Sequence, residues 1–123
     1  MSIVNVTFKN QHFGKIHARM FQNDVWYSVK DVCRLLKLSP EIAIESNLDS
    51  DEYTQFQEFN DDYTIKSSNL LVNSVGLASL LELNQNESVA NWFDYFIKPK
   101  SDKLIEQMGG VEDSCKINVT YEG

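Results

Sequence analysis

In the segment Trp26-Tyr27-Ser28-Val29-Lys30-Asp31-Val32-Cys33-Arg34-Leu35-Leu36, an aromatic strand leads directly into an amphipathic helix, and this is the most informative pattern in the chain. Ser28 stands where a helix N-cap is expected, and Asp31 follows three residues later, as in an acidic variant of the capping box. The spacing i, i+3, i+4 and i+7 of one helix face is taken by Val29, Val32, Cys33 and Leu36. The pattern predicts a strand-to-helix corner whose helix runs over 29–38.

Basic side chains lie on the outside of this corner. Lys30, Arg34 and Lys37 fall off the apolar helix face, and the preceding strand adds Lys15 and Arg19. Such a strip suits contact with phosphate or with an acidic partner. The same spacing is more typical of an ordinary solvated helix face, with a lysine placed favourably near the helix C-terminus. Both interpretations stay open, and these five residues form the candidate basic face.

The segments around the corner predict an α+β domain. Alternating apolar residues before it indicate a three-strand meander, and Ser39-Pro40 after it indicate the start of a second short helix. Turn residues and helical periodicity place the later elements. We expect a hairpin with arms 53–59 and 63–66, a short strand over 70–72, a helix from Asn73 or Ser74 to about Leu83, a helix over 87–97 ended by Pro99, and a short helix over 104–108 stopped by Gly109-Gly110.

The length of 123 residues suits one domain, which we place at residues 1–100, followed by a short helix and a mobile tail over 101–123. No apolar run is long enough to span a membrane, and residues 1–10 do not resemble a signal peptide. Cys33 and Cys115 show no pairing pattern, which predicts free thiols in a reducing cytoplasm. Self-association is left open, although residues 117–121 have a composition suited to adding a strand to a neighbouring sheet.

Charge is divided unevenly along the chain, whose net charge is −7. Residues 1–40 hold six Lys or Arg and two Asp or Glu, whereas residues 41–62 hold eight Asp or Glu and no Lys or Arg. The acidic stretch, with aromatic residues interleaved, suits either phosphate mimicry toward a DNA-binding protein or a charged hairpin protected from aggregation. The candidate acidic face is Glu41, Glu45, Asp49, Asp51, Glu52, Glu58, Asp61 and Asp62.

No arrangement of residues predicts catalysis or a cofactor. The chain lacks a glycine-rich phosphate loop, a nucleophile elbow and a cluster of metal ligands at ligand spacing. His12 and His17 have no carboxylate or thiol nearby in the sequence that would make a metal site, so they are interpreted as surface histidines. Trp92, Phe93 and Phe96 stand at helical spacing and are interpreted as core. We therefore expect neither enzymatic activity nor a bound cofactor or metal.

Several motifs occur in the order found in the Bro-N domain of phage and large-DNA-virus antirepressor-type proteins, which this chain resembles over about residues 6–99. The match at the corner is the fullest, where an aromatic pair precedes Lys-Asp-Val-Cys. The motifs are Phe8-Lys9-Asn10, Phe13-Gly14-Lys15-Ile16, Trp26 to Cys33, Ser39-Pro40, Ala43-Ile44, Val72-Asn73-Ser74-Val75-Gly76-Leu77, Ala90, Phe93, Phe96 and Pro99.

The resemblance implies an α+β fold and a role in viral gene regulation in the cytoplasm of a bacterial host. Some family members look like DNA binders, and others act as antirepressors that bind a repressor protein. This chain has acidic or neutral residues, Glu41, Glu45 and Asp94-Tyr95, where the family often carries basic ones. We therefore expect an antirepressor-like regulator that binds a repressor or another DNA-binding protein. The alternatives are a DNA-binding module using the basic face and an acidic DNA mimic that inhibits a host defence protein.

Overall fold

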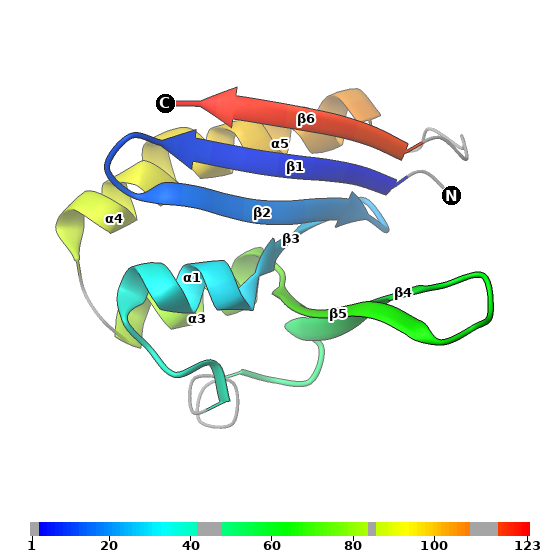
Figure 1. The fold of residues 1–123 in the computed structure, drawn as a ribbon. Coiled ribbons are helices and arrows are strands. Elements are labelled where there is room, and N and C mark those ends of the chain that lie inside the picture. The colour runs from blue at the N-terminus through cyan, green and yellow to red at the C-terminus, as the bar shows by residue number, and fades with distance from the viewer. Residues whose placement is uncertain (1–2, 42–47, 84–85, 109–115) are drawn as a thin grey trace.

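Six strands form one mixed sheet in the order β4-β5-β3-β2-β1-β6 (Figure 1). The strands are β1 (Ile3–Asn10), β2 (Gly14–Phe21), β3 (Asp24–Ser28), β4 (Tyr53–Phe59), β5 (Ile65–Val72) and β6 (Lys116–Glu122). The helical elements are α1 (Val29–Leu36), α3 (Ser74–Leu83), α4 (Glu87–Trp92), η1 (Phe93–Ile97) and α5 (Lys98–Met108). This computed structural model describes residues 3–41, 48–83, 86–108 and 116–123. The predicted α+β class is confirmed.

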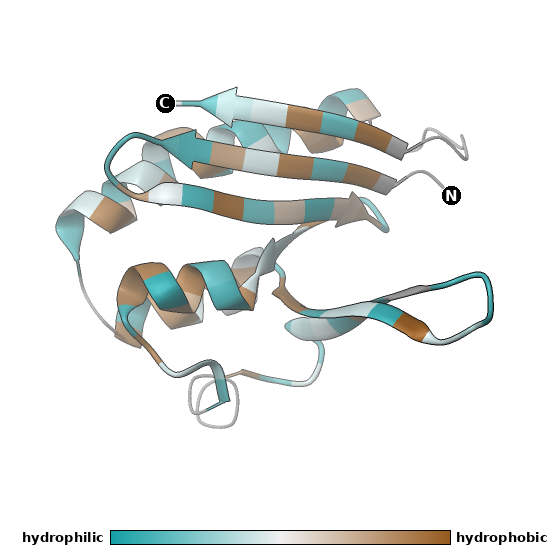
Figure 2. Ribbon diagram, viewed as in Figure 1, coloured by the Kyte–Doolittle hydropathy of each residue, from teal (hydrophilic) through white to brown (hydrophobic). Residues whose placement is uncertain are grey.

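The meander β1-β2-β3 has the antiparallel pairing that its alternating sequence predicts. Val6 lies opposite Ala18, and Ala18 lies opposite Tyr27. Every second residue of these strands is buried, and Figure 2 shows the matching alternation of brown and teal along β1 and β2. One face of the sheet therefore builds the core with α3, α4 and α5, while the other face stays polar.

The helix α1 begins where the sequence predicts and ends two residues earlier. The backbone N–H of Asp31 donates to Ser28 Oγ over 3.3 Å, which confirms the N-cap. Lys37 adopts the left-handed conformation with φ 57°, and the Leu38 N–H donates to the Cys33 carbonyl over 2.9 Å. These bonds form a Schellman ending, in which glycine is the usual residue. Pro40 and Glu41 are helical, and the rest of the predicted second helix lies outside the described residues.

The predicted apolar face of α1 is buried, and it includes Cys33 as a free thiol whose pKa is raised by burial. Cys115 lies outside the described residues. Trp92 and Phe93 are also buried in the core, and Phe96 packs against it, as their spacing predicts. Within the described residues, no helix combines the length and the apolar character that crossing a membrane requires.

The hairpin β4-β5 is confirmed, but its second arm is longer than predicted. The segments 63–66 and 70–72, expected as separate strands, belong largely to the continuous strand β5. Only two residue pairs join β5 to β3, Tyr27 with Val72 and Ser28 with Leu71. In Figure 1 the hairpin extends away from the helices, on the side opposite the β1-β2 turn.

Asn73 holds the base of the hairpin to α3. Its side-chain oxygen accepts from the Gly76 N–H over 3.0 Å, which makes it the N-cap of α3. Its backbone N–H donates to the Glu52 carbonyl over 3.0 Å, and its side-chain amide donates to the Asp51 carbonyl over 3.2 Å. Gly76 packs so closely on this backbone that a Cβ there would lie 2.9 Å from the Glu52 oxygen.

The prediction that Pro99 ends the helix begun at Glu87 is wrong. The chain stays helical from α4 through the π-helical segment η1 to α5 without a break. The Lys98 N–H donates to the Phe93 carbonyl, five residues back, and Pro99 is the second residue of α5. Proline is tolerated in a first helical turn because its missing N–H has no required partner there, and the change of register at η1 creates such a turn.

The prediction of a mobile tail is wrong for residues 116–122, which form β6. This strand pairs parallel to β1, with Val119 beside Val6. Ile117, Val119 and Tyr121 pack against the core. Alternation of apolar residues was visible in the sequence, but the partner strand is more than a hundred residues away. The strand that was a candidate for pairing with a neighbouring molecule thus pairs within the chain.

A buried polar chain joins the sheet to the long helix. The Tyr27 hydroxyl donates to Ser101 Oγ over 2.7 Å, and Ser101 Oγ donates to the Ile97 carbonyl over 2.8 Å. Burial, more than any other cause, raises the pKa of Tyr27 to about 12. The phenol therefore stays protonated and keeps its donor role over a wide pH range.

Replacing Gly76 with alanine tests the close approach of α3 to the hairpin base. Helix propensity alone predicts that Gly76→Ala stabilises by about 1 kcal/mol. The contact with the Glu52 carbonyl predicts instead a loss of about 1–3 kcal/mol in the free energy of unfolding. Urea unfolding measures the change, and Ala78→Gly, at an exposed position of the same helix, calibrates the propensity term. A gain in stability for Gly76→Ala contradicts the close approach.

Replacing Tyr27 with phenylalanine tests the buried hydroxyl. Because the folded pKa of about 12 exceeds the ordinary tyrosine pKa of 10.0, the wild-type protein loses stability as the pH rises between these values. The loss amounts to about 2–3 kcal/mol once the pH exceeds the folded pKa. Unfolding curves between neutral and strongly alkaline pH should show a steeper fall for wild type than for Tyr27→Phe. Parallel curves for the two proteins would contradict the assignment.

Candidate functional site

The polar face of the sheet is the main candidate site, because no helix among the described residues covers it (Figure 1). The positions that alternate with the core residues of β1 and β2 lie here, including Asn5, Thr7, His17 and Arg19. β6 adds Asn118, whose side-chain oxygen accepts from the Asn5 amide over 3.1 Å. The face is thus rich in hydrogen-bonding groups and open to solvent.

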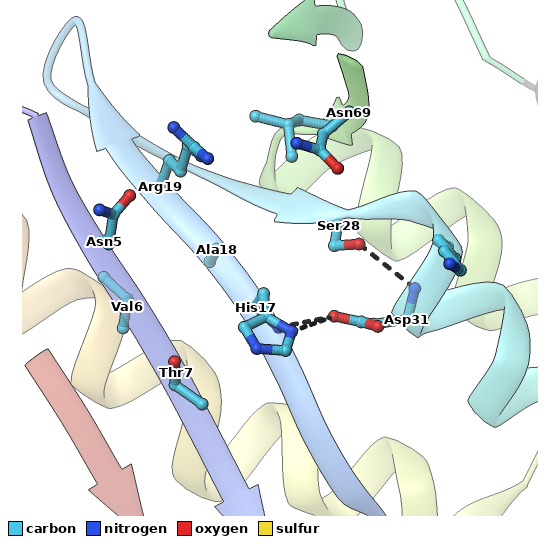
Figure 3. Close-up of a pocket in the computed structure, with 11 residues that line it drawn as sticks. Asn5, Val6, Thr7, His17, Ala18, Arg19, Ser28, Asp31 and Asn69 are labelled. Atoms are coloured by element: carbon cyan, nitrogen blue, oxygen red, sulfur yellow. Dashed lines mark hydrogen bonds and ion pairs between the residues drawn. The ribbon is translucent and has the colours of Figure 1, made fainter. Parts of the chain in front are cut away.

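A pocket of about 430 Å³ is hollowed into this face (Figure 3). Strands β1 and β2 form its floor, the start of α1 forms one side, and Asn69 and Leu71 of β5 form another. Figure 3 shows Asn5, Arg19 and Asn69 around its upper part, with His17 and Asp31 below. β5 joins β3 over two residue pairs, Tyr27 with Val72 and Ser28 with Leu71, next to this wall of the pocket.

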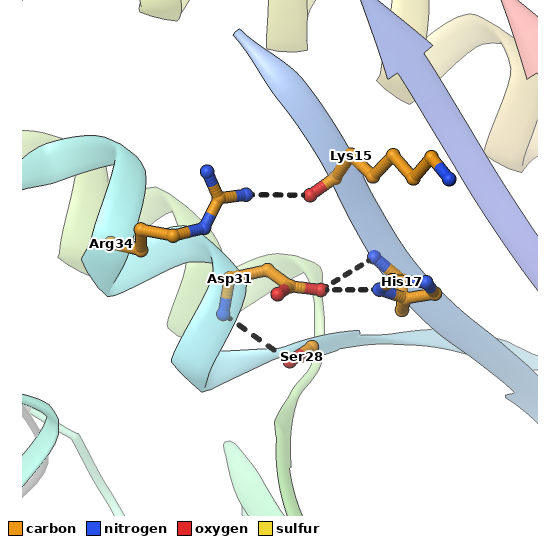
Figure 4. Close-up of polar contacts among 5 residues, drawn as sticks. All are labelled: Lys15, His17, Ser28, Asp31 and Arg34. Atoms are coloured by element: carbon orange, nitrogen blue, oxygen red, sulfur yellow. Dashed lines mark hydrogen bonds and ion pairs between the residues drawn. The ribbon is translucent and has the colours of Figure 1, made fainter.

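An ordered histidine–carboxylate pair lines the pocket (Figure 4). Asp31 Oδ2 accepts from the backbone N–H of His17 over 2.9 Å and lies 2.8 Å from its ring Nδ1. The sequence interpretation of His17 as a surface histidine is confirmed, but its partner was not foreseen. The capping-box interpretation is half correct, because the Asp31 carboxylate turns to His17 rather than back to the backbone of Ser28.

The five residues of the predicted basic face are not brought together as one strip. Arg19 and Lys30 line the pocket, whereas Lys15 lines a second hollow near the β1-β2 turn. Arg34 donates to the Lys15 carbonyl over 2.8 Å and so has a structural role (Figure 4). Lys37 forms the end of α1. Of the five residues, Arg19 and Lys30 therefore lie at the pocket and Lys15 lies elsewhere. Arg34 and Lys37 have roles in the structure of α1.

An aromatic cluster lies beside the pocket and was not predicted. The rings of Phe21 and Trp26 stack with centroids 5.4 Å apart, and Phe56 of β4 lies 5.7 Å from Phe21. The Arg19 guanidinium sits 4.2 Å over the Phe56 ring. These contacts join the hairpin to the meander and hold Arg19 at the pocket. Because the rings cover one another, they are poorly placed to stack on nucleic-acid bases.

The predicted acidic face is divided between the two ends of the hairpin. Asp49, Asp51 and Glu52 lie at its base, with carboxylate oxygens within 4.8 Å of one another, and Asp61 and Asp62 lie at its tip. β4 separates the two groups by roughly 20 Å, from the rise per residue of a strand. Glu41 is exposed at the start of the second helix, and Glu45 and the side chain of Glu58 lie outside the described part of the chain. The base cluster could hold a cation, although exposed carboxylates often gather without one.

Hydrogen bonds connect the residues of the turn at the tip of the hairpin. The Asn60 N–H donates to the Thr64 carbonyl over 2.8 Å, and Asp62 accepts from both the Thr64 N–H and the Thr64 hydroxyl. These bonds from Thr64 lower the pKa of Asp62, so its carboxylate stays ionised. Tyr63 has a left-handed φ of 66° and is 88% exposed. A bulky residue held in that conformation is uncommon and often marks a functional position.

Sequence reasoning missed the residues that come together only through tertiary contacts. Asn69 reaches the pocket from a strand more than fifty residues after His17, and the Arg19–Phe56 contact joins two unrelated hairpins. The pocket is lined by Arg19, Lys30 and several polar side chains, and the hairpin tip carries two carboxylates and the exposed ring of Tyr63.

Removing the Asp31 carboxylate tests the histidine–carboxylate pair. Asp31→Ala leaves the backbone N–H of His17 without its acceptor, which should lower the free energy of unfolding by about 1–3 kcal/mol. His17→Ala keeps that backbone bond and should cost less. Urea unfolding compares the two variants, and amide exchange at residue 17 should accelerate only in Asp31→Ala. Equal losses with unchanged exchange would refute the role assigned to Asp31.

Comparison with known proteins finds no family model, no curated protein and no solved structure that matches this chain. The resemblance to the Bro-N family therefore stays a prediction from the motifs. The two candidate surfaces of the described residues are the pocket on the open sheet face and the acidic tip of the β4-β5 hairpin.

Proposed function

We propose that the chain is a non-enzymatic, phage-type regulatory protein of antirepressor character, which binds a repressor or another DNA-binding protein through the β4-β5 hairpin. The observation that carries the proposal is the acidic, internally hydrogen-bonded hairpin tip with the exposed Tyr63 at its end. The resemblance to Bro-N proteins supports the regulatory class, and the geometry of the tip supports the kind of partner.

The charge of the tip fits a basic partner surface. Asp61 and Asp62 are exposed, and no Lys or Arg occurs over residues 41–62. DNA-binding proteins present Lys and Arg where they contact phosphate, so their binding surfaces are complementary to such a tip. Because the acidic groups at the tip and base lie roughly 20 Å apart along β4, local docking of the tip is better supported than mimicry of a continuous phosphate row.

Tyr63 has the properties of an interface anchor. Tyrosine is among the residues that carry most binding energy in protein interfaces. Tyr63 is 88% exposed, and Ile65 on the same hairpin is 56% exposed. The hydrogen bonds of Thr64 to Asn60 and Asp62 hold the turn before binding, so little conformational entropy is lost when a partner docks.

Direct DNA binding by the basic face receives less support. Arg34 is engaged with the Lys15 carbonyl, and Lys37 lies at the end of α1, away from the pocket cations. The net charge of −7 opposes the approach of a polyanion. The rings of the aromatic cluster cover one another and leave little free surface for bases.

The test is an operator-release assay with the repressor encoded in the same genome as this chain. Excess wild-type protein should displace the repressor from its operator in a gel shift. Tyr63→Ala should raise the concentration needed by at least about tenfold, as expected for removal of an interface anchor. Tyr95→Ala is the matched control, because Tyr95 is 79% exposed on η1 and lies outside the hairpin.

Two outcomes would contradict the proposal. One is a repressor that stays on its operator at excess protein. The other is an equal effect of the two tyrosine substitutions, with both variants folded by circular dichroism. Reversing the charge at the tip with Asp61→Lys adds a second comparison, because Asp61 is exposed and the change should weaken release without unfolding the protein.

A further inference from the structure

The strand β6 forms one edge of the sheet, and no described strand pairs with its outer side (Figure 1). On the inner side, the Gly123 N–H donates to the Lys9 carbonyl of β1 over 3.0 Å. Because the backbone groups of successive residues alternate between the two sides of a strand, those of Asn118 and Thr120 point to the outer side. This edge therefore presents backbone donors and acceptors to a further strand.

The edge of β6 runs without interruption and borders apolar side chains that are only partly covered. β6 pairs with β1 in one continuous register, and its seven residues include no proline or glycine. Ile117, Val119 and Tyr121 pack against the core but are only partly buried. A strand added outside β6 would therefore cover apolar surface as well as satisfy backbone groups.

The sequence of β6 is complementary to itself in the antiparallel direction. When two copies of the strand pair about Val119, apolar residues stand opposite apolar ones, and residues of opposite charge stand opposite each other. The opposed pairs are Lys116 with Glu122, Ile117 with Tyr121, Asn118 with Thr120, and Val119 with Val119 of the second copy.

The direction of the backbone groups supports the same register. Asn118 and Thr120, whose backbone groups point outward, meet as a hydrogen-bonded pair, and the two copies of Val119 meet as a non-hydrogen-bonded pair. A shift by one residue would set outward groups against inward ones and mix the two faces of the sheet. A shift by two residues would shorten the pairing and separate Lys116 from Glu122.

The other edge strand, β4, lacks this complementarity. Its pairing with β5 is interrupted by a register shift between Glu58 and Phe59. Residues 41–62 include no Lys or Arg, so two copies of β4 would bring acidic residues together with no basic residue to offset them. Of the two edges, β6 is therefore the one suited to a second copy of the chain.

We propose that the chain forms a two-fold symmetric homodimer, in which β6 of each copy pairs antiparallel about Val119 with β6 of the other. The two sheets then join into one, with a β4-β5 hairpin at each far end. Glu122 is available for the contact, because its ion pair with Lys9 is 4.0 Å long and its side chain is 77% exposed. The dimer does not depend on the function proposed for the hairpin tip.

Amide hydrogen exchange of the full chain measures both the pairing and its register. As the protein concentration rises, exchange at Asn118 and Thr120 should slow, because their N–H groups gain acceptors in the second copy. Val119 and Tyr121, whose N–H groups point toward β1, should be protected at every concentration. Sedimentation velocity over the same concentrations should show monomer converting to dimer.

Charge reversal tests the contact between the two ends of β6. Lys116→Glu places like charges opposite each other at two symmetric positions and should raise the dissociation constant of the dimer roughly tenfold. Combining it with Glu122→Lys returns opposite charges to these positions and should restore the wild-type value. Lys66→Glu makes the same charge change at an exposed position of β5, toward the other end of the sheet, and should leave the dissociation constant near that of wild type.

A proline in the edge tests the backbone pairing. Thr120→Pro removes an outward N–H and leaves those that face β1, so it should abolish the dimer while circular dichroism shows that the fold persists. The proposal is overturned by a protein that stays monomeric at millimolar concentration, or by exchange at Asn118 and Thr120 that does not depend on concentration. It is also overturned by a charge reversal that the double variant does not repair, or by a dimer that persists in Thr120→Pro.

Discussion

The packing of α1 against the sheet depends on the part of β2 that has no pairing with β3. Pairing with β3 covers β2 only from Ala18 onward, so the backbone groups of Lys15 and His17 need other partners. Side chains of α1 provide them, since Arg34 donates to the Lys15 carbonyl and Asp31 accepts from the His17 N–H. Side chains of α1 thus take the place of a neighbouring strand as hydrogen-bond partners of the β2 backbone. Without them, backbone N–H and C=O groups of β2 would be left unpaired, which costs free energy.

The contact between α1 and β2 also determines which side chains of α1 are buried or engaged and which ones line the pocket. With α1 held beside β2, its apolar face enters the core, and its first turn borders the pocket. Residues that looked alike in the sequence then take different roles. Lys30 lines the pocket, whereas Arg34, one turn further, is used to hold the helix. The uneven charge of the chain is distributed over two surfaces, a pocket lined by Arg19 and Lys30 and a hairpin tip that carries Asp61 and Asp62.

Elements with local sequence signals are predicted correctly. The predictions are wrong where the structure of a segment depends on residues far away in the chain. The meander, the capped start of α1, the arm 53–59 of the hairpin and the start of α3 followed from alternation, capping residues and turns. Pro99 was misjudged, because the register change in η1 that accommodates it has no local signal. The segment 116–122 was assigned to a mobile tail, because its parallel partner β1 lies at the other end of the chain.

Local patterns in the sequence account for the α+β class, the strand-to-helix corner, the buried face of α1 and the division into basic and acidic regions. These depend on neighbours a few residues apart, whose spacing sets which side of a helix or strand they occupy. Which charged side chains come into contact depends on tertiary packing. The pairing of His17 with Asp31, the seating of Arg19 on Phe56 and the arrival of Asn69 at the pocket depend on β3, α1 and the hairpin packing together. Such contacts join residues far apart in the chain, and no local pattern encodes their distance or orientation.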